Sequence, residues 1–328
     1  MTAPPAGSGS ALPGEPREAW SGLLRVDKPT GVTSHDVVDR VRRRLRTKSA
    51  GHLGTLDPGA SGLLVLALGA ATRCAQVWQT GLKTYEATVC FGVVTNTQDL
   101  QGEVLERHEV ALDERQVRAA AAAFTGEIEQ VPPMVSALKV GGQRLHRLAR
   151  RGEVVERRPR RVTVHSWEWL GFALPEASFR VVVSRGTYVR TLAHDLGARL
   201  GPGGALKSLR RLRSEPFGLE RAVGLRDLDS DTPQEVLERA GVPLAEALRV
   251  LPLVALDEAG AAELGFGRRP VVEPGAAPLR AGPRSVVFFG PGGEPLALGE
   301  LESDPARPGA ALACPHVVFP WAVRKGRS

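Results

Sequence analysis

Residues 51–62 read GHLGTLDPGASG, and this stretch decides what fold and what chemistry to expect. Its four glycines and one proline predict a tightly folded loop rather than a helix or a strand. The loop carries one carboxylate, Asp57, and one imidazole, His52. The apolar run 63–71 follows at once, and we expect it to anchor the loop in the core. Rigid loops on a buried scaffold are where proteins usually place catalytic groups.

Two other interpretations of this loop need weighing. Asp-Pro often opens a turn, and a lone Asp in a loop most often caps something, so chemistry alone favours a capping role for Asp57 over a catalytic one. The glycines also suggest a phosphate cradle, but the P-loop pattern ends in Gly-Lys-Ser or Gly-Lys-Thr, and the loop has no such triplet. The loop therefore remains a candidate catalytic segment, and the nucleotide-binding interpretation is excluded.

Regular elements are predicted on both sides of the loop. Upstream, 23–26 reads as a short strand that ends at the turn 27–31. Thr33 or Ser34 then caps a helix with one apolar stripe, formed by Val37, Val38, Val41 and Leu45. Downstream, the patterns predict a half-buried strand at 84–91, a helix at 115–124, a strand at 179–183 and a helix at 189–200 closed by Gly201-Pro202.

The two ends of the chain differ from this central part. Residues 1–22 are rich in Pro, Gly and Ala and lack the basic start and apolar core of a signal peptide, so a disordered tail is expected. Residues 236–248 are predicted to be helical. From residue 253 onward short strands alternate with glycines and prolines, at 285–289, 296–300 and 317–319. This texture predicts a small all-β domain.

Composition bounds the class of protein. A chain of 328 residues exceeds what one core usually serves, so two domains are expected. With 42% hydrophobic and 24% charged residues, the chain is neither fibrous nor wholly disordered. Its longest apolar run is too short to span a bilayer, which argues against a membrane protein. Three separated cysteines without a C-x-x-C pair argue against a disulfide framework or a zinc site and favour the cytoplasm.

The charge of +7 is concentrated in three basic clusters. Nine basic and two acidic residues lie in 139–161, six basic residues and no acid in 40–48, and five basic residues and no acid in 199–213. Solvated helix faces usually mix the two signs. We therefore interpret the clusters as a footprint for a phosphate backbone, with solubility as the alternative.

The 51–62 stretch resembles the signature of bacterial TruB-type tRNA pseudouridine synthases, which isomerise uridine 55 in the T loop. Further motifs agree in order and spacing, at 26–31, 33–35, 83–85, 97–102, 133–139, 184–190 and 209–212. The likeness runs from about residue 23 to 213 and resumes in the C-terminal strands, which are similar to a PUA-type RNA-binding domain. Three features depart from it: Gly59 replaces a larger apolar residue, tyrosines are missing from the basic arm at Val135 and 145–148, and the tail has no counterpart.

The resemblance implies an α+β fold, with a mixed, largely antiparallel curved sheet, flanking helices and a small C-terminal β-barrel-like PUA-type domain. The expected division is a disordered tail at 1–22, a catalytic domain at 23–250 and a PUA-like domain at 251–328. Within the catalytic domain, 131–161 is expected to be an RNA-binding arm.

The resemblance also assigns roles to side chains. Asp57 is the essential carboxylate and Arg190 the cation that pairs with it, which would keep the carboxylate ionised. Tyr85 stacks on the uracil and is the candidate base for the C5 proton. Without the resemblance Tyr85 reads as a core tyrosine, and Arg190 is equally compatible with a structural surface residue. The substrate- and RNA-binding candidates are His52, Lys28, Tyr188, Leu209, Asp99, Lys139, Arg150 and Arg151. Lys28 and Leu209 match pocket-lining positions of the family, and Lys28 is expected to fix backbone structure rather than to take part in the chemistry.

Pseudouridine formation breaks the N1–C1′ bond, turns the uracil and rejoins it through C5. The reaction is redox-neutral and adds no atoms, so neither a cofactor nor a metal is expected. The target base has to be extruded from its stack to reach a pocket. tRNA is the expected partner, without a membrane and without an obligate protein partner.

Two rival functions share some of these features. The first is a guide-RNA-dependent pseudouridine synthase, which has the same motifs but depends on partner proteins; the long basic arm favours the stand-alone form. The second is a non-catalytic tRNA-binding chaperone built on the basic clusters. The presence of Asp57, Tyr85 and Arg190 argues against this second function.

Overall fold

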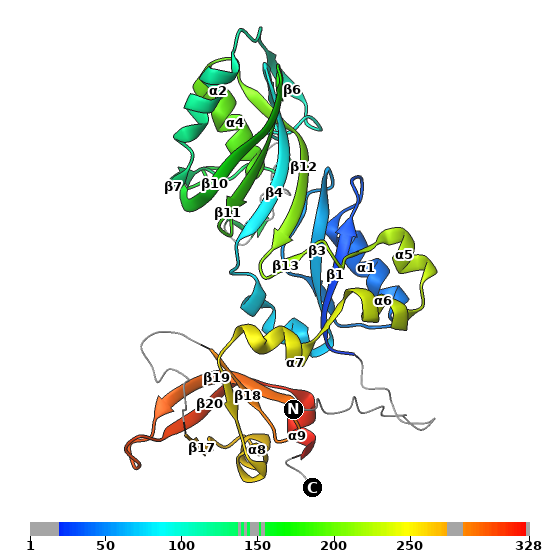
Figure 1. Cartoon of the computed structure of the whole chain (residues 1–328), viewed down its shortest axis with the longest axis vertical. Helices are drawn as coiled ribbons and strands as arrows, with labels where there is room; N and C mark the ends of the chain where they lie inside the picture. Colours follow the sequence, from blue (N-terminus) through cyan, green and yellow to red (C-terminus); the bar gives the residue numbers. More distant parts are fainter. Residues whose placement is uncertain are drawn as a thin grey trace, which may run out of the picture.

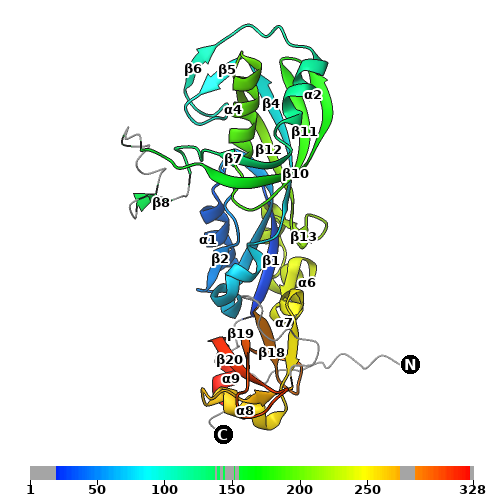
Figure 2. The same ribbon diagram turned by 90° about the vertical axis from the view of Figure 1, so that its left-hand side faces the viewer.

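The computed structural model describes residues 20–325, apart from 137–138, 141–142, 145–150, 152–154 and 274–284. Residues 1–19 of the predicted tail 1–22 and Arg150 therefore lie outside the described residues. The end of that predicted tail is ordered, since Trp20 packs against the core and Gly22 begins the first strand. The molecule is elongated, with one long twisted sheet in its upper part and a second sheet below it (Figures 1 and 2). None of the helices in the described ranges has the length and apolar character needed to cross a bilayer.

The large sheet has eleven strands and mixes parallel with antiparallel pairs. Its main path is β14 (Val223–Gly224), β1 (Gly22–Lys28), β3 (Ala60–Leu68), β12 (Gly204–Ser214), β4 (Lys83–Phe91), β11 (Glu176–Val183), β10 (Arg160–Ala173) and β7 (Gly126–Gln130). Three short strands pair beside it, β2 (Ala50–His52), β13 (Phe217–Gly218) and β15 (Gly241–Pro243). On the main path β1–β14 and β3–β12 are parallel and the other pairs antiparallel, which confirms the predicted mixed, largely antiparallel sheet.

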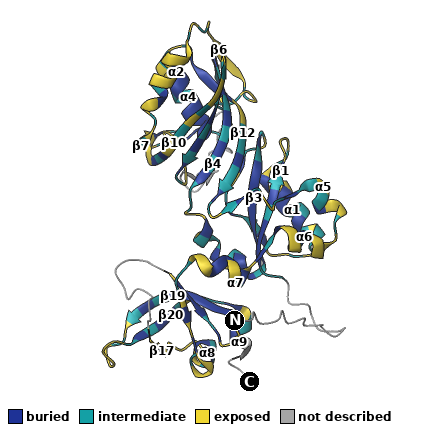
Figure 3. Ribbon diagram, in the orientation of Figure 1, coloured by how far each residue is buried: buried dark blue, intermediate teal, exposed yellow. Residues whose placement is uncertain are grey.

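Strand β3 anchors the site because it is buried on both faces. Leu64, Leu66 and Leu68 point into a core shared with helix α1 (Ser34–Arg44). Leu63, Val65 and Ala67 point into a second core, against the 3₁₀ segment η1 (Gly69–Trp78). The apolar run therefore fixes the end of the 51–62 loop from two sides, as the sequence predicts (Figure 3).

Most predicted elements are confirmed within one to three residues. Thr33 caps α1 in a capping box with Asp36, and β4 alternates buried and half-buried residues along its whole length. Helices α2 (Glu114–Ala122) and α4 (Val189–Leu200) form as expected, and Gly201, with a φ of 105°, ends α4. Helices α1 and α4 contribute to the same core, one above the other on one face of the sheet (Figure 2).

Two predictions were wrong in their details. The ends of the 51–62 stretch are strands rather than loop, since β2 reaches His52 and β3 begins at Ala60. The predicted helix at 236–248 is broken into α6 (Pro233–Ala240), β15, α7 (Leu244–Ala247) and η2 (Leu248–Val250). Pro243 explains the break, because it disfavours the helical conformation for Val242, which instead pairs with Leu23 of β1.

The C-terminal sheet has five strands, in the order β16 (Leu253–Ala255), β18 (Val286–Phe289), β19 (Pro295–Ser303), β20 (Ala311–Val318) and β17 (Val271–Val272). The expectation of an all-β region was incomplete, because helices α8 (Glu258–Gly265) and α9 (Pro320–Lys325) pack together beside it. Val287, Leu298 and Phe319 share a buried cluster with β3 and η1. The two sheets are therefore joined by a continuous apolar contact.

The remaining described elements are short. They are the pair β5 (Val93–Thr95) and β6 (Val104–Arg107), the hairpin β8 (Lys139–Val140) and β9 (Gln143–Arg144), and helix α5 (Leu225–Ser230). Cys74, Cys90 and Cys314 are free thiols, and burial raises the pKa of Cys74 to about 12.

Candidate active site

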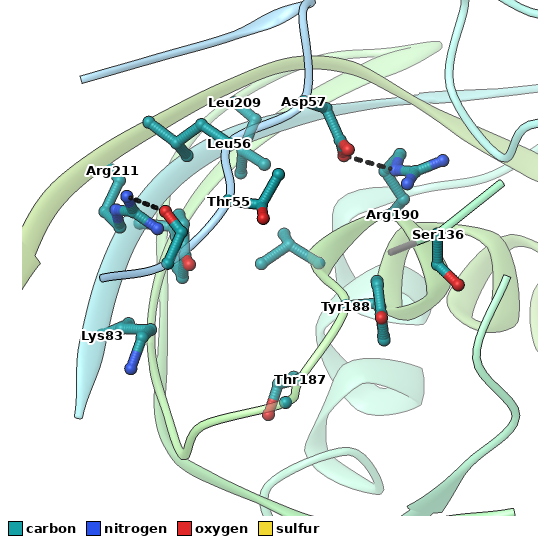
Figure 4. Close-up of a pocket in the computed structure, with 14 residues that line it drawn as sticks. Thr55, Leu56, Asp57, Lys83, Ser136, Thr187, Tyr188, Arg190, Leu209 and Arg211 are labelled. Atoms are coloured by element: carbon teal, nitrogen blue, oxygen red, sulfur yellow. Dashed lines mark hydrogen bonds and ion pairs between the residues drawn. The ribbon is translucent and has the colours of Figure 1, made fainter. Parts of the chain in front are cut away.

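A cavity of about 240 Å³ lies where five distant parts of the chain meet (Figure 4). It is lined by residues 54–57 of the loop, by Lys83 and Tyr85 of β4, by Leu209 and Arg211 of β12, by Ser136 and by residues 186–190 at the start of α4. Asp57, Tyr85, Tyr188, Arg190 and Leu209 were all predicted from the sequence, and the structure brings the five together.

Asp57 is held by backbone contacts on both sides of its loop. The buried hydroxyl of Ser34 donates to the carbonyl of Leu56 at 2.9 Å and accepts from the Leu56 N–H at 2.8 Å. Beyond Asp57, the N–H of Gly31 donates to the carbonyl of Pro58 at 2.8 Å. The Asp57 side chain remains 41% exposed. The loop is thus rigid, and its carboxylate is accessible.

Arg190 is the cation that holds this carboxylate. Its Nε lies 2.9 Å from Oδ2 of Asp57, although the Arg190 side chain is only 4% exposed. Its Nη1 donates to the carbonyl of Thr97 at 2.7 Å and its Nη2 to the carbonyl of Val135 at 2.8 Å. These three contacts fix the direction of the buried guanidinium. The guanidinium therefore orients the Asp57 carboxylate and pairs with its negative charge.

A strained turn supports Arg190 from behind. Gln98 has a φ of 66°, in the left-handed region that non-glycine residues rarely adopt. The hydroxyl of Thr191 donates to the Gln98 side-chain oxygen at 2.7 Å, and the hydroxyl of Thr97 donates to Oδ1 of Asp99 at 2.7 Å. Oδ2 of Asp99 lies 3.6 Å from Nη1 of Arg190. Asp99 is therefore placed to act on the guanidinium; it does not line the 240 Å³ cavity, but it lines a small hollow beside it together with Asp57 and Arg190.

Both tyrosines of the chain line the cavity. Tyr85 is 7% exposed and belongs to the buried face of β4. Tyr188 is fixed through its backbone, which exchanges two hydrogen bonds with the side chain of Gln130. Burial raises the pKa of the Tyr188 phenol, while a hydrogen bond with Ser136 acts in the opposite direction. The cavity thus has aromatic and apolar walls and a single aimed carboxylate.

Lys28 was expected to line the pocket, and the structure places it elsewhere. Its side chain is fully buried beneath the loop, where Nζ donates to the carbonyls of Pro29 at 2.9 Å and Val32 at 2.8 Å. Burial lowers the pKa of Lys28 to about 8, although the nearby charge of Asp57 opposes that shift. Lys28 therefore stabilises the loop rather than forming a pocket wall.

Sequence reasoning missed two cations of the cavity. Arg211 is 2% exposed, and its Nε and Nη2 donate to the carbonyls of Leu63 and Gly54 at 2.7 and 3.0 Å. Lys83 is 8% exposed, and burial together with the charges of Arg211 and Arg185 lowers its pKa to about 8. The missing signal was periodicity, because residues two apart on a strand share a face. If Tyr85 and Leu209 line the cavity, then Lys83, two residues before Tyr85, and Arg211, two residues after Leu209, are expected to line it as well.

The other predicted RNA-binding residues lie outside this cavity. His52 lines a neighbouring hollow with Arg160 and Arg161. Lys139 lies in the β8–β9 hairpin, which projects away from the main body (Figure 2), and Arg151 is exposed.

The basic clusters look different in space from how they look in sequence. Arg40 is paired with Asp229 and Arg210 with Asp27, each about 180 to 190 residues away in sequence. Arg213 lies 2.9 Å from Glu215. Much of clusters 40–48 and 199–213 therefore joins elements of the protein. The single-sign footprint predicted for these two clusters was too broad.

The fold and the site together define a class. In a solved complex titled Cbf5–Nop10–Gar1, one chain superimposes on 92% of this chain with a TM-score of 0.69 and 30% sequence identity, over 86% of its own length. A chain of an H/ACA RNP bound to a substrate RNA containing 2′-deoxyuridine matches with a TM-score of 0.67 and 27% identity, covering 93% of this chain and 92% of its own. The class is that of the pseudouridine synthases.

Sequence comparison narrows this class to a family. The model of the TruB family pseudouridylate synthase N-terminal domain matches residues 42–189, and the model of the tRNA pseudouridylate synthase B C-terminal domain matches residues 190–249. A tRNA pseudouridine synthase B of Burkholderia mallei is 48% identical over 79% of this chain and 83% of its own length. Another of Thermobifida fusca is 44% identical over 89% and 98%. The chain belongs to the TruB family, and it is an enzyme that isomerises uridine in tRNA to pseudouridine.

Proposed function

We propose that this enzyme modifies uridine 55 in the T loop of tRNA, by flipping that nucleotide into the cavity beside Asp57. The observation that carries the proposal is the contact of 2.9 Å between Asp57 and the buried Arg190, in a cavity lined by Tyr85 and Tyr188. An aimed carboxylate beside aromatic surface suits an extruded base, because the base loses its stacking partners on leaving the RNA.

In this proposal Asp57 is the essential carboxylate, acting on the nucleotide at its glycosidic bond. The N1–C1′ bond breaks, the uracil turns and a C5–C1′ bond forms. The proton that leaves C5 is balanced by the proton that N1 gains, so substrate and product are isomers. Tyr85 stacks on the uracil and takes the C5 proton. Arg190 holds the Asp57 carboxylate in its orientation through these steps, by the contact of 2.9 Å.

The remaining parts bind the RNA. Leu209 supplies an apolar wall for the base, and His52, in the hollow next to the cavity, contacts the T loop near the gap that the base leaves. The arm 131–161 closes over the RNA. The region 251–328 forms a PUA-like module that holds the acceptor side of the tRNA. The exposed Arg151 and the projecting β8–β9 hairpin support this role for the arm. We place the enzyme in the cytoplasm with its tRNA.

A guide-RNA-dependent mode is the second candidate, because the Cbf5 chain found in a complex with Nop10 and Gar1 shares this fold at 30% identity. The identities of 44% and 48% to tRNA pseudouridine synthase B proteins favour action on tRNA directly. We therefore expect the purified chain to need no protein partner and no guide.

The test is conversion of an unmodified tRNA transcript by the purified chain alone, read by carbodiimide adducts that stop primer extension. We expect a stop at position 55, and none in a matched transcript with cytidine at that position. A stop at another uridine would overturn the site assignment. Conversion only after addition of a guide RNA would favour the second candidate.

A further inference from the structure

A second hollow, of about 530 Å³, opens beside the active-site cavity and shares Lys83 with it. This second hollow is lined by Arg160 and Arg161 of β10, by Arg185 and by His52. Gly54, Thr55 and Gly186 also belong to both spaces, so the two are continuous. In Figure 4, Lys83 and Arg211 lie on one side of the cavity, and Arg190 and Tyr188 lie on the opposite side. Lys83 therefore lies at the junction.

Among the described residues that line the second hollow, the cations outnumber the acids. Nζ of Lys83 donates only to neutral groups among its described contacts, the carbonyls of Gly81 at 2.9 Å and Gln79 at 3.4 Å. The charges that act on it come from Arg211 and Arg185, and both are positive. Glu127 lies 3.3 Å from Arg161, but both side chains of that pair are exposed. The hollow therefore has an excess of positive charge.

Keeping a lysine in this position costs stability. A cation that is 92% buried has lost most of its hydration, and neutral carbonyls replace that hydration only in part. A methionine would fill the same volume without that cost. A buried, aimed cation among other cations is therefore better explained by an anionic ligand than by the needs of the fold.

We propose that Lys83, with Arg160 and Arg185, forms a subsite for a backbone phosphate of the RNA strand that delivers the target nucleotide. This inference rests on the proposed function. The strand whose base occupies the Asp57 cavity carries its neighbouring phosphates into the adjoining hollow. Lys83, at the shared wall, is placed to meet the first of them. The ligand class is a phosphodiester, and the residue acts in substrate positioning.

The subsite predicts an unusual pH dependence of RNA affinity. Phosphate binding requires the protonated amine, and the pKa of Lys83 in the free protein is about 8. Above pH 8 binding therefore has to take up a proton, so affinity falls by about tenfold between pH 7 and pH 9. Arginines 160, 161, 185 and 211 are other cations that line the two spaces, and they are present in every variant compared. His52 and Tyr85 are the other titratable groups at the junction, and a comparison with Lys83→Arg cancels their contribution.

The experiment compares the full-length chain with Lys83→Arg, Lys83→Met and the control Lys207→Met. Lys207 is a half-exposed lysine of β12 paired with Glu176 at 2.6 Å. Three quantities are measured at constant ionic strength: the Kd for a T-stem-loop RNA at pH 7 and pH 9, the conversion rate at saturating RNA, and the thermal midpoint.

We expect Lys83→Met to bind about tenfold more weakly at pH 7, with the loss falling on KM more than on kcat. Its thermal midpoint should rise. The affinity of Lys83→Arg should stay level from pH 7 to pH 9, while that of the unchanged chain and of Lys207→Met falls.

If the RNA affinities of the unchanged chain and of Lys83→Arg change in the same way from pH 7 to pH 9, the proposed subsite is overturned. A Lys83→Met variant with normal affinity and a lowered thermal midpoint would show instead that the lysine only braces the turn 79–81. Failure of the proposed function is seen separately, as absence of pseudouridine at saturating RNA with the unchanged chain.

Discussion

At the residue scale, the site depends on a few buried polar groups with fixed directions. Arg190 illustrates this, since three of its nitrogens reach three different acceptors, on Asp57, Thr97 and Val135. A lysine carries the same charge but lacks the planar fork that makes such contacts at once. Charge alone therefore does not explain the residue at this position.

We expect Arg190→Lys to fold and bind RNA but to lose at least about 100-fold in the rate of the chemical step, because the Asp57 carboxylate is no longer aimed. Single-turnover conversion at saturating enzyme measures this rate. A variant that keeps more than a tenth of the rate would show that the orientation of Asp57 does not depend on the guanidinium.

Lys28 gives a second prediction at this scale. Its pKa is lowered from 10.5 to about 8 by burial, so between these two values the unfolded chain binds more protons than the folded one. The free energy of unfolding of the unchanged chain, relative to that of Lys28→Met, should therefore rise from pH 8 to pH 10.5, by at most about 3 kcal/mol. Urea unfolding at several pH values measures the difference. A difference that is constant with pH would contradict the buried, lowered pKa.

At the scale of elements, α1 and β3 together position the loop that carries Asp57. The Ser34 hydroxyl, at the first turn of α1, bonds twice to the backbone of Leu56, and β3 holds the other end of the loop in two cores. Packing on both sides gives the loop a single conformation. The loop is rigid because of its neighbours and not because of its own sequence.

Substitutions of two adjacent residues at the start of α1 separate the positioning of the loop from the stability of the helix. Ser34→Ala leaves two buried backbone groups of Leu56 without a partner, so we expect a loss of about 1–3 kcal/mol and a lower rate of conversion. Thr33→Ala removes the helix cap, for about 1 kcal/mol, and leaves the loop contacts in place. Thermal unfolding and single-turnover rates distinguish the two. Equal rates in both variants would argue against loop positioning by Ser34.

The elements also show what local sequence can predict. Helix α4 matches its predicted range, 189–200, because its apolar spacing and its terminal glycine agree. The segment 236–248 was predicted wrongly, since its apolar residues suggested one helix while Pro243 and pairing with β1 impose a strand. The cavity residues Lys83 and Arg211 were missed because the motifs single out Tyr85 and Leu209 alone. The period of two along a strand places Lys83 on the same face as Tyr85, and Arg211 on the same face as Leu209.

At the scale of the whole molecule, the distribution of charge depends on the fold. Arg40 and Arg210 belong to basic runs in the sequence, yet each pairs with an aspartate far along the chain. Sequence alone does not place those partners together, so it overestimates the basic surface. The positive charge that remains at the Lys83 hollow lies beside the cavity, on the path that we propose for the RNA strand.

The shared core of the two sheets makes a prediction about stability. Phe319, after β20, is fully buried in the cluster that joins the C-terminal sheet to β3 and η1. Phe319→Ala should lower the free energy of unfolding by about 3 kcal/mol, and it should loosen the C-terminal sheet. Urea unfolding and limited proteolysis measure both effects. Unchanged stability would show that the two sheets do not share a cooperative core.

The central claim is that the carboxylate of Asp57, aimed by Arg190, performs the chemistry. The most direct measurement is the single-turnover conversion of tRNA by Asp57→Asn, alongside its affinity for the same RNA, with Asp229→Asn as a control at a surface ion pair. The substitution keeps the size of the side chain and removes its charge. We predict that Asp57→Asn forms no pseudouridine while its affinity stays within a few-fold of that of the unchanged chain, and that Asp229→Asn retains activity. Substantial pseudouridine formation by Asp57→Asn would contradict the account.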